Sequence, residues 1–241
     1  MTIARPGEFA ITDRALEIAN YKMGSRILDI GCGEGDTVNH LNNMGLKAEG
    51  IEMNLSKIST AKEKFPGIDV KFGDGSFLDD YMSYTFDGIT MECSLSMINQ
   101  PDEALHEAYC VMKKGGRLII TDVYEIDPDP QQVKAVALEA DRQAKIPHVE
   151  GECDEGTVMR YVNFRYEGAF YKEPLIRMIE DEIGMKVIAF EDRTSDLENY
   201  IAQTLMDEGT LDNLCTDVKL EVDGKKRKIG YFLLVAQKPV M

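Results

Sequence analysis

Short apolar runs alternate with amphipathic segments along the first half of the chain. The apolar runs cover residues 26–30, 47–52, 68–74, 86–92 and 117–123. The segments at 36–45, 54–65 and 101–116 carry apolar residues at the spacing of one helix face, and the last ends at a pair of glycines. Apolar strands that alternate with helices are typical of a parallel sheet covered on both faces.

The alternation stops after residue 123. Residues 124–172 contain Pro128 and Pro130, a helical pattern at 131–145 and an irregular acidic stretch. We expect this part to be an inserted cap over the carboxyl edge of the sheet, in a single domain of residues 1–241 whose core is 22–123 plus 173–241. The remaining pattern predicts a helix at 173–185, a strand at 186–192, a helix at 194–209 and a last strand at 231–237.

Two local signals refine this second half. Ser195 and Glu198 have the spacing of a capping box at the start of the predicted helix. Asp223-Gly224 predicts a hairpin turn before the last strand, and places the basic run at 225–228 near the hairpin tip.

A glycine-rich turn follows the first apolar run, in the stretch RILDIGCGEGDTV. Residues 31–35 hold three glycines between a predicted strand and a predicted helix, the arrangement of a nucleotide cradle. A dinucleotide-binding fingerprint would need a third glycine where Asp36 stands. Glu34 and Asp36 add negative charge that disfavours a pyrophosphate, so together with Asp29 they indicate a ligand with a cationic end.

The spacing D-x-G-x-G-x-G resembles motif I of the class I S-adenosylmethionine (SAM)-dependent methyltransferases. The resemblance continues in order with Glu52 at the end of the second apolar run, GDGS at 73–76 and FDGITMECSLSMI at 86–98. Residues 101–123 are similar to the ubiquinone/menaquinone-biosynthesis and arsenite-methylating branch, the methyltransferase type 11 domain. The resemblance implies a Rossmann-like α/β fold: a seven-stranded, mostly parallel sheet with an antiparallel last strand, and helices on both faces.

The resemblance also implies the cofactor and its contacts. SAM would be bound, and S-adenosylhomocysteine would be released as the product. Asp29 would hold the ammonium directly or through water, Glu52 the ribose hydroxyls, and Asp74 would lie near the adenine amino group. The expected cofactor-binding residues are Asp29, Gly31, Cys32, Gly33, Gly35, Glu52, Met53, Asp74, Gly75, Ser76, Glu92 and Cys93.

Methyl transfer from a sulfonium needs mainly alignment and exclusion of water, and a base only if the acceptor arrives protonated. Glu92, Asp122 and Tyr124 follow predicted strands at the same edge and are the candidates to orient or deprotonate the acceptor; the alternative is that they only form pocket wall. The stretch ECSL replaces the [ND]PP[YF] motif of amine-methylating branches, which disfavours amino methylation of that type.

Residues before the first strand often fold over the cofactor in this family. Arg5, Phe9 and Tyr21 are the candidates to close the pocket, and a solvent-exposed leader is the alternative. His148 lies in the expected cap, where it could touch substrate. The amphipathic stretch at 196–215 is a candidate homodimer face.

Composition narrows the classes of partner and the compartment that we expect for this protein. The formal net charge of −16 repels phosphate backbones, so we expect no nucleic-acid partner. The five cysteines form no CxxC pair, which fits a reducing compartment, and no apolar run approaches the roughly 20 residues of a membrane span. With no apolar leader at the N-terminus, we expect a cytoplasmic protein that holds no metal.

The sequence leaves more than one function open. The leading interpretation is a SAM-dependent methyltransferase acting on a small molecule. The alternatives are a non-catalytic SAM-binding sensor or scaffold, an enzyme that uses SAM for another reaction type, and an arsenite-type thiol or metalloid methyltransferase. The last would use Cys93, Cys153 and Cys215, although their spacing does not match that family's cysteine set well.

Overall fold

The computed structural model describes residues 5–145, 161–210 and 218–240. Its main sheet has the strand order β3-β2-β1-β4-β5-β11-β8. The strands are β1 Arg26–Ile30, β2 Lys47–Glu52, β3 Val70–Phe72, β4 Phe86–Glu92, β5 Met112–Glu125, β8 Lys186–Asp192 and β11 Ile229–Gln237. The first five strands pair in parallel, and β11 runs antiparallel to both β5 and β8. The predicted fold class is therefore confirmed.

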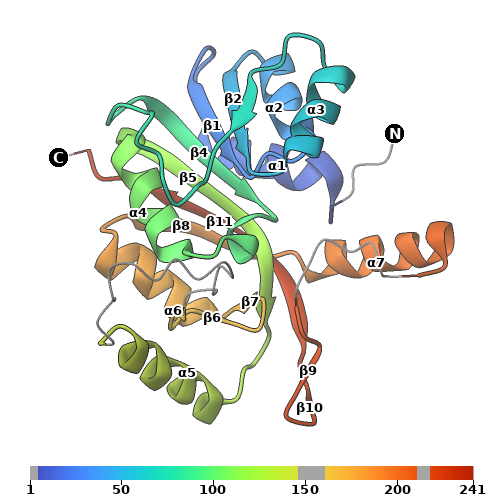
Figure 1. The fold of residues 1–241 in the computed structure, drawn as a ribbon, viewed down its shortest axis with the longest axis vertical. Helices are drawn as coiled ribbons and strands as arrows, with labels where there is room; N and C mark the ends of the chain where they lie inside the picture. The colour runs from blue at the N-terminus through green and yellow to red at the C-terminus, as the bar shows by residue number, and fades with distance from the viewer. Residues whose placement is uncertain (1–4, 146–160, 211–217, 241) are drawn as a thin grey trace.

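Helices cover both faces of this sheet (Figure 1). They are α1 Glu8–Ala19, α2 Asp36–Asn43, α3 Leu55–Lys64, α4 Pro101–Val111, α5 Pro130–Gln143, α6 Lys172–Arg177 and α7 Thr194–Glu208, with a 3₁₀ turn η1 at Leu95–Met97 and a π-helical turn η2 at Met178–Glu182. One buried cluster joins α1, α2 and α3 to the sheet, and a second joins α4, α6 and η2 to it. Both faces of β1 are buried, which explains its unbroken apolar sequence.

Two predicted boundaries and a predicted capping box were wrong. The helix that begins at Pro101 ends at Val111, and Met112 already belongs to β5 because its backbone pairs with Phe86 of β4. The third strand covers three residues only. The expected capping box is absent: Arg193 is the N-cap of α7, and Asp192 accepts hydrogen bonds from the amide and hydroxyl of Thr194. Tertiary pairing and a neighbouring carboxylate override the local pattern in these places.

The segment after β5 contains a hairpin that the sequence pattern did not indicate. Strands β6 Arg165–Tyr166 and β7 Ala169–Phe170 are joined by Glu167-Gly168, both with positive φ, as a two-residue hairpin turn requires. Strand β7 pairs with β5 at Tyr124, so the hairpin is attached to the carboxyl end of the central sheet. The helix expected at 131–145 is α5, which lies far from α1–α3 (Figure 1).

A second, two-stranded hairpin precedes the last strand. It consists of β9 Glu221–Val222 and β10 Lys225–Lys226, which pair antiparallel around Asp223-Gly224 as expected. Among the described residues, no helix combines the length and the apolar composition needed to cross a membrane.

Candidate functional site

A cleft of about 250 Å³ lies at the carboxyl ends of β1, β2 and β4. Ligands of open α/β sheets bind at this edge. The lining residues are Ile30, Gly31, Glu52, Met53, Lys57, Gly73, Asp74, Gly75, Ser76, Cys93, Ser94, Met97, Ile98, Asn99 and Gln100. Seven of the twelve residues expected to bind the cofactor are therefore in the cleft wall: Gly31, Glu52, Met53, Asp74, Gly75, Ser76 and Cys93.

The glycine loop is held against β2 and requires glycine at two positions for different reasons. The amides of Gly31 and Cys32 both donate to the carbonyl oxygen of Ile51, at 2.9 and 3.0 Å. Gly31 has a φ of +75°, and a Cβ there would lie 2.5 Å from the Cβ of Ser94. Gly33 has a φ of +55°, but a Cβ there would meet nothing within 4 Å. The space beside Gly33 is therefore open to a ligand that approaches the backbone closely.

Glu52 braces this loop from the end of β2. One carboxylate oxygen accepts from the amide of Gly33 at 3.0 Å, and the other accepts from the amide of Asn54 at 2.8 Å. Each carboxylate oxygen has a second lone pair. Glu52 can thus hold the loop and still accept a hydrogen bond from a ligand in the cleft.

The turn after β3 forms another part of the cleft wall. The Asp74 carboxylate accepts from the amide of Ser76 at 2.9 Å and from its hydroxyl at 2.7 Å, through the same oxygen Oδ1. A Cβ at Gly75 would lie 2.4 Å from Cγ2 of Ile30, so the turn approaches β1 more closely than any side chain would allow. The fixed turn leaves the second oxygen of Asp74 for a donor group in the cleft.

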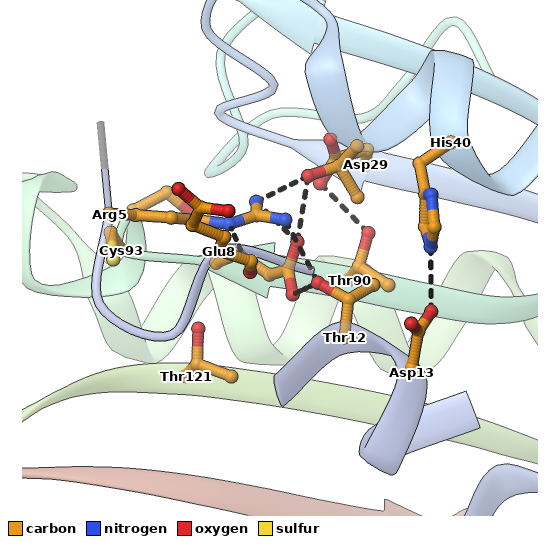
Figure 2. Close-up of polar contacts among 12 residues, drawn as sticks. Arg5, Glu8, Thr12, Asp13, Asp29, His40, Thr90, Cys93 and Thr121 are labelled. Carbon is orange, nitrogen blue, oxygen red and sulfur yellow. Dashed lines mark hydrogen bonds and ion pairs between the residues drawn. The ribbon is translucent and has the colours of Figure 1, made fainter. Parts of the chain in front are cut away.

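Asp29 and Glu92 lie beneath the loop and outside the cleft lining. Asp29 accepts from the Thr90 hydroxyl at 2.8 Å (Figure 2). Burial, reinforced by the nearby charge of Glu92, raises the pKa of Asp29 to about 7. The other expected residues Cys32, Gly33 and Gly35 are also absent from the lining, although Gly33 borders it through its amide contact with Glu52.

Glu92 is enclosed by the N-terminal segment. Its Oε2 lies 2.7 Å from Nη1 of Arg5 and accepts from the hydroxyl of Thr37, while Oε1 accepts from the hydroxyl of Thr12, both at 2.7 Å. Arg5 also donates to the hydroxyls of Thr12 and Thr37, and its charge attracts the carboxylate of Asp29 (Figure 2). Polar partners thus occupy both carboxylate oxygens of Glu92.

The segment before β1 folds against α2, which follows the glycine loop. The ring of Phe9 stacks on His40 with centroids 3.9 Å apart, and Nε2 of His40 lies 2.6 Å from Asp13 (Figure 2). The alternative of a solvent-exposed leader is therefore wrong for Arg5 and Phe9. The expectation that Tyr21 closes the pocket was wrong, because its hydroxyl donates to the carbonyl of Arg117 near the amino ends of the strands.

Cys93 directly follows β4 and has an unusual backbone conformation. Its φ is +53°, a conformation that costs energy for any residue with a side chain and that often marks a functional site. Its Sγ lies 2.8 Å from the hydroxyl oxygen of Tyr231, and burial raises the pKa of the thiol to about 12. The thiol therefore stays protonated near neutral pH, which disfavours metalloid binding through a thiolate.

The other residues of the metalloid hypothesis, Cys153 and Cys215, lie outside the described residues, as does His148. Within the part of the chain that the structure describes, no group of three or more His, Cys, Asp and Glu side chains is placed to hold a metal ion.

Asp122 and Tyr124 do not line the cleft. The carboxylate of Asp122 accepts from the amide of Ser96 at 2.9 Å, and burial raises its pKa to about 6. Tyr124 packs edge-on against Phe190 and Phe232, with centroids 5.8 and 5.9 Å away. The structure thus brings neither residue next to the expected cofactor, and Asp122 instead holds the turn that follows β4.

The sequence analysis missed part of the cleft wall and its support. Met97, Ile98, Asn99 and Gln100 form one wall, and the buried side chain of Arg165 donates to the backbone of this stretch. No local signal marks Arg165, because it contacts residues far away in the sequence.

The fold and the cleft define a protein class: an α/β domain that binds a nucleotide-like cofactor at a glycine loop after its first strand. The model of a family described as "Methyltransferase domain" matches residues 21–168, more than half of the chain. The chain belongs to this methyltransferase domain family, which confirms the expected resemblance to class I SAM-dependent methyltransferases.

Individual proteins agree with this assignment. The chain is 30% identical over 99 residues to a demethylmenaquinone methyltransferase of Renibacterium salmoninarum, a match that covers 41% of each protein. The chain thus spans about two-fifths of the length of that curated relative. It resembles the structure of geranyl diphosphate methyltransferase in complex with SAM, with a TM-score of 0.66, 14% identity and coverage of 96% and 85%.

This structural similarity and the next one, both below 25% identity, concern the fold alone. The [4+2]-cyclase SpnF superimposes with a TM-score of 0.62 and 22% identity, covering 96% of this chain and 80% of the cyclase. A protein with this fold can thus carry a name from another reaction type, so the reaction must be argued from the site.

Proposed function

We propose that the chain binds SAM in the cleft between β1, β2 and β4 and transfers its methyl group to a small-molecule acceptor. The observation that carries the proposal is the cleft lined by Glu52 and Asp74, with the open backbone of Gly33 at its border beside Glu52. A ligand with a carboxylate, two vicinal hydroxyls and an amino-purine fits this set of donors and acceptors.

The residues present fit the parts of SAM. The free lone pairs of Glu52 suit the ribose hydroxyls, and Asp74 and Ser76 suit the polar edge of adenine. The amides of the glycine loop suit the carboxylate. The carboxyl group of Asp29 lies beneath the loop, and although burial raises its pKa to about 7, a nearby sulfonium or ammonium would favour its ionised form.

When bound, SAM supplies a methyl carbon that is already activated by a positively charged sulfur. The chain then has to hold the acceptor in line with that carbon and keep water out. Met53, Met97 and Ile98 contribute apolar side chains to the cleft. Glu92, Asp122 and Tyr124 are engaged elsewhere, so we propose that they position the site and that no general base among them is needed.

We further propose that residues 22–123 and 173–241 form the core and that 124–172 is an insertion at its carboxyl edge. The pairing of β7 with the end of β5 supports this division. The insertion would then contribute to acceptor binding, since it borders the edge where methyl transfer would take place.

Turnover tests the proposal. The chain is incubated with SAM carrying an isotopically labelled methyl group and with fractions of a small-molecule extract, and S-adenosylhomocysteine and labelled products are measured by mass spectrometry. We expect S-adenosylhomocysteine together with a product that is heavier by one labelled methyl group. SAM binding without turnover in any fraction would favour the sensor or scaffold, and a product without the label would indicate another reaction type.

A further inference from the structure

Arg165 lies in the hairpin that is attached to the end of the central sheet. It opens β6, and the pairing of β6 with β7 and of β7 with β5 fixes its backbone. Its side chain runs into the protein interior, and only 6% of the residue is exposed. A buried guanidinium must find partners for its donors, so its contacts show what it holds in place.

Among the residues that the structure describes, the hydrogen-bond acceptors of Arg165 all belong to the turn after β4. Its Nη1 donates to the carbonyl of Ser96 at 3.0 Å and to the carbonyl of Ile98, and its Nη2 donates to the carbonyl of Asn99 at 3.3 Å. The carbonyl of Ser96 belongs to the short helix η1, and those of Ile98 and Asn99 follow it, where no further helical turn could bond to them. Arg165 therefore supplies the hydrogen bonds that this stretch of backbone lacks.

Asp122 holds the same turn from the other direction. Its Oδ2 accepts from the amide of Ser96, whose carbonyl accepts from Arg165. The charges of Asp122 and Arg165 attract each other, and burial lowers the pKa of Arg165 to about 10, which leaves it protonated at neutral pH. The peptide units around Ser96 are thus fixed between an anion and a cation.

This turn is also a wall of the cleft. Residues 97–100 line it together with Asp74 and Ser76, the residues that would face the adenine of SAM. A shift of this backbone would change the shape of the cleft directly, although Arg165 itself does not line it.

We infer that Arg165 is a positioning residue for the cofactor cleft: it fixes the wall at 97–100 and thereby makes cofactor affinity depend on the hairpin β6–β7. The inference rests on the proposed function, since it assigns Arg165 to the same site. It also gives the segment after β5 a role in cofactor binding, in addition to any contact with the acceptor.

Lysine would not replace this arginine. The planar guanidinium presents five donors in a fork, so it can reach three carbonyls that point in different directions. An ammonium would keep the charge facing Asp122 but has a compact head with three donors. Arg165→Lys should therefore retain part of the electrostatic interaction and lose the geometry that fixes the wall.

Lys238 provides a matched control. It is also a buried cation, and its Nζ donates to the carbonyls of Tyr109 and Met112, at 2.6 and 2.8 Å. These carbonyls lie where α4 meets β5, and neither they nor Lys238 line the cleft. Lys238→Met should destabilise the fold in a comparable way without touching the cleft wall.

The test compares the unsubstituted chain with the variants Arg165→Met, Arg165→Lys and Lys238→Met. Dissociation constants for SAM and for adenosine are measured by calorimetry well below each variant's Tm, together with deuterium uptake of the peptide covering 95–100. We expect Arg165→Met to weaken both ligands by about tenfold, Arg165→Lys to weaken them less, and Lys238→Met to leave both within about twofold. Deuterium uptake at 95–100 should rise in the two Arg165 variants only.

Two results would overturn the inference. One is an unchanged affinity for SAM and adenosine in the Arg165 variants. The other is an equal loss of affinity in Lys238→Met, which would show that Arg165 contributes only to the general stability of the fold. If Arg165→Met does not fold, the inference is tested by comparing Arg165→Lys with Lys238→Met, in ligand affinity and in deuterium uptake at 95–100. Failure of the unsubstituted chain to bind SAM would instead contradict the proposed function, and the inference with it.

Discussion

The carboxylate of Glu92 lies 2.7 Å from the guanidinium of Arg5, although 87 residues separate them in the sequence. The pair joins the N-terminal segment to the end of β4, directly beside the glycine loop. Because the side chains of Arg5 and Glu92 are only 12% and 3% exposed, this contact differs from the surface ion pairs elsewhere in the molecule.

The first prediction concerns this pair. Arg5→Met leaves the buried Glu92 without its cation, so we expect the free energy of unfolding to fall by about 3 kcal/mol, as for other buried pairs that lose one partner. Urea denaturation measures the change. The control is Arg14→Met, which removes a more exposed arginine that pairs with Glu17 and Glu191 and should change stability little. Equal effects of the two substitutions would contradict the structure.

The second prediction follows from the raised pKa of Asp29. Its value is about 7 in the folded chain and near 3.8 in an unfolded one, so the folded state holds a proton more tightly. The contribution of Asp29 to stability is therefore fully present below about pH 4 and is lost as the pH rises to about 7.

Asp29→Asn, which cannot titrate, removes this contribution. The unfolding free energy of the unsubstituted chain should fall more steeply between pH 4 and 7 than that of the variant, as measured by urea denaturation at several pH values. Parallel pH profiles of the two proteins would show that Asp29 ionises normally in the fold.

The third prediction separates backbone strain from ligand space at the glycine loop. Gly33 and Gly67 both have positive φ, +55° and +88°, and a Cβ at either position would meet nothing within 4 Å. Alanine at either position should lower the free energy of unfolding by about 1 kcal/mol, since each substitution forces an L-residue into the left-handed region. Only Gly33→Ala adds a methyl group beside the cleft and should weaken SAM binding. Equal SAM affinity of the two variants in calorimetry would show that no ligand approaches Gly33.

The fourth prediction concerns thiol reactivity. Burial raises the pKa of the Cys93 thiol, which lies against the hydroxyl of Tyr231, whereas Cys110 is exposed. Iodoacetamide at pH 8 should therefore label Cys110 well before Cys93, as followed by peptide mass spectrometry. Rapid labelling of Cys93 would show that its thiolate is accessible, and would strengthen the alternative of a metalloid methyltransferase.

The glycine loop and its neighbours could be predicted from the sequence because their signals are local. Gly31 and Gly33 are needed for their own backbone conformations. Glu52 ends one strand that the apolar pattern identifies, and Asp74 lies in the turn after another. The parallel strand order then brings these strand ends together at one edge, so the cleft follows from the pattern of elements.

The contacts of Arg5 and Arg165 could not be predicted in this way. Arg165 donates to Ser96 across 69 residues, and neither position carries a pattern that identifies its partner. The same limit explains the wrong end of the helix that begins at Pro101: the backbone of Met112 pairs with Phe86, and only the assembled sheet supplies that partner. Tyr124 was misplaced because its position after an apolar run fits a site residue and a packed core residue equally well.

The most direct measurement is a calorimetric titration of SAM into the unsubstituted chain, into Glu52→Gln and into Glu49→Gln. Both glutamates belong to β2, but Glu49 pairs with Arg26 and Lys71 and does not line the cleft. The account predicts that the unsubstituted chain and Glu49→Gln bind SAM alike, and that Glu52→Gln binds it at least about tenfold more weakly. Absence of SAM binding by the unsubstituted chain, or equal affinity of all three proteins, would contradict it.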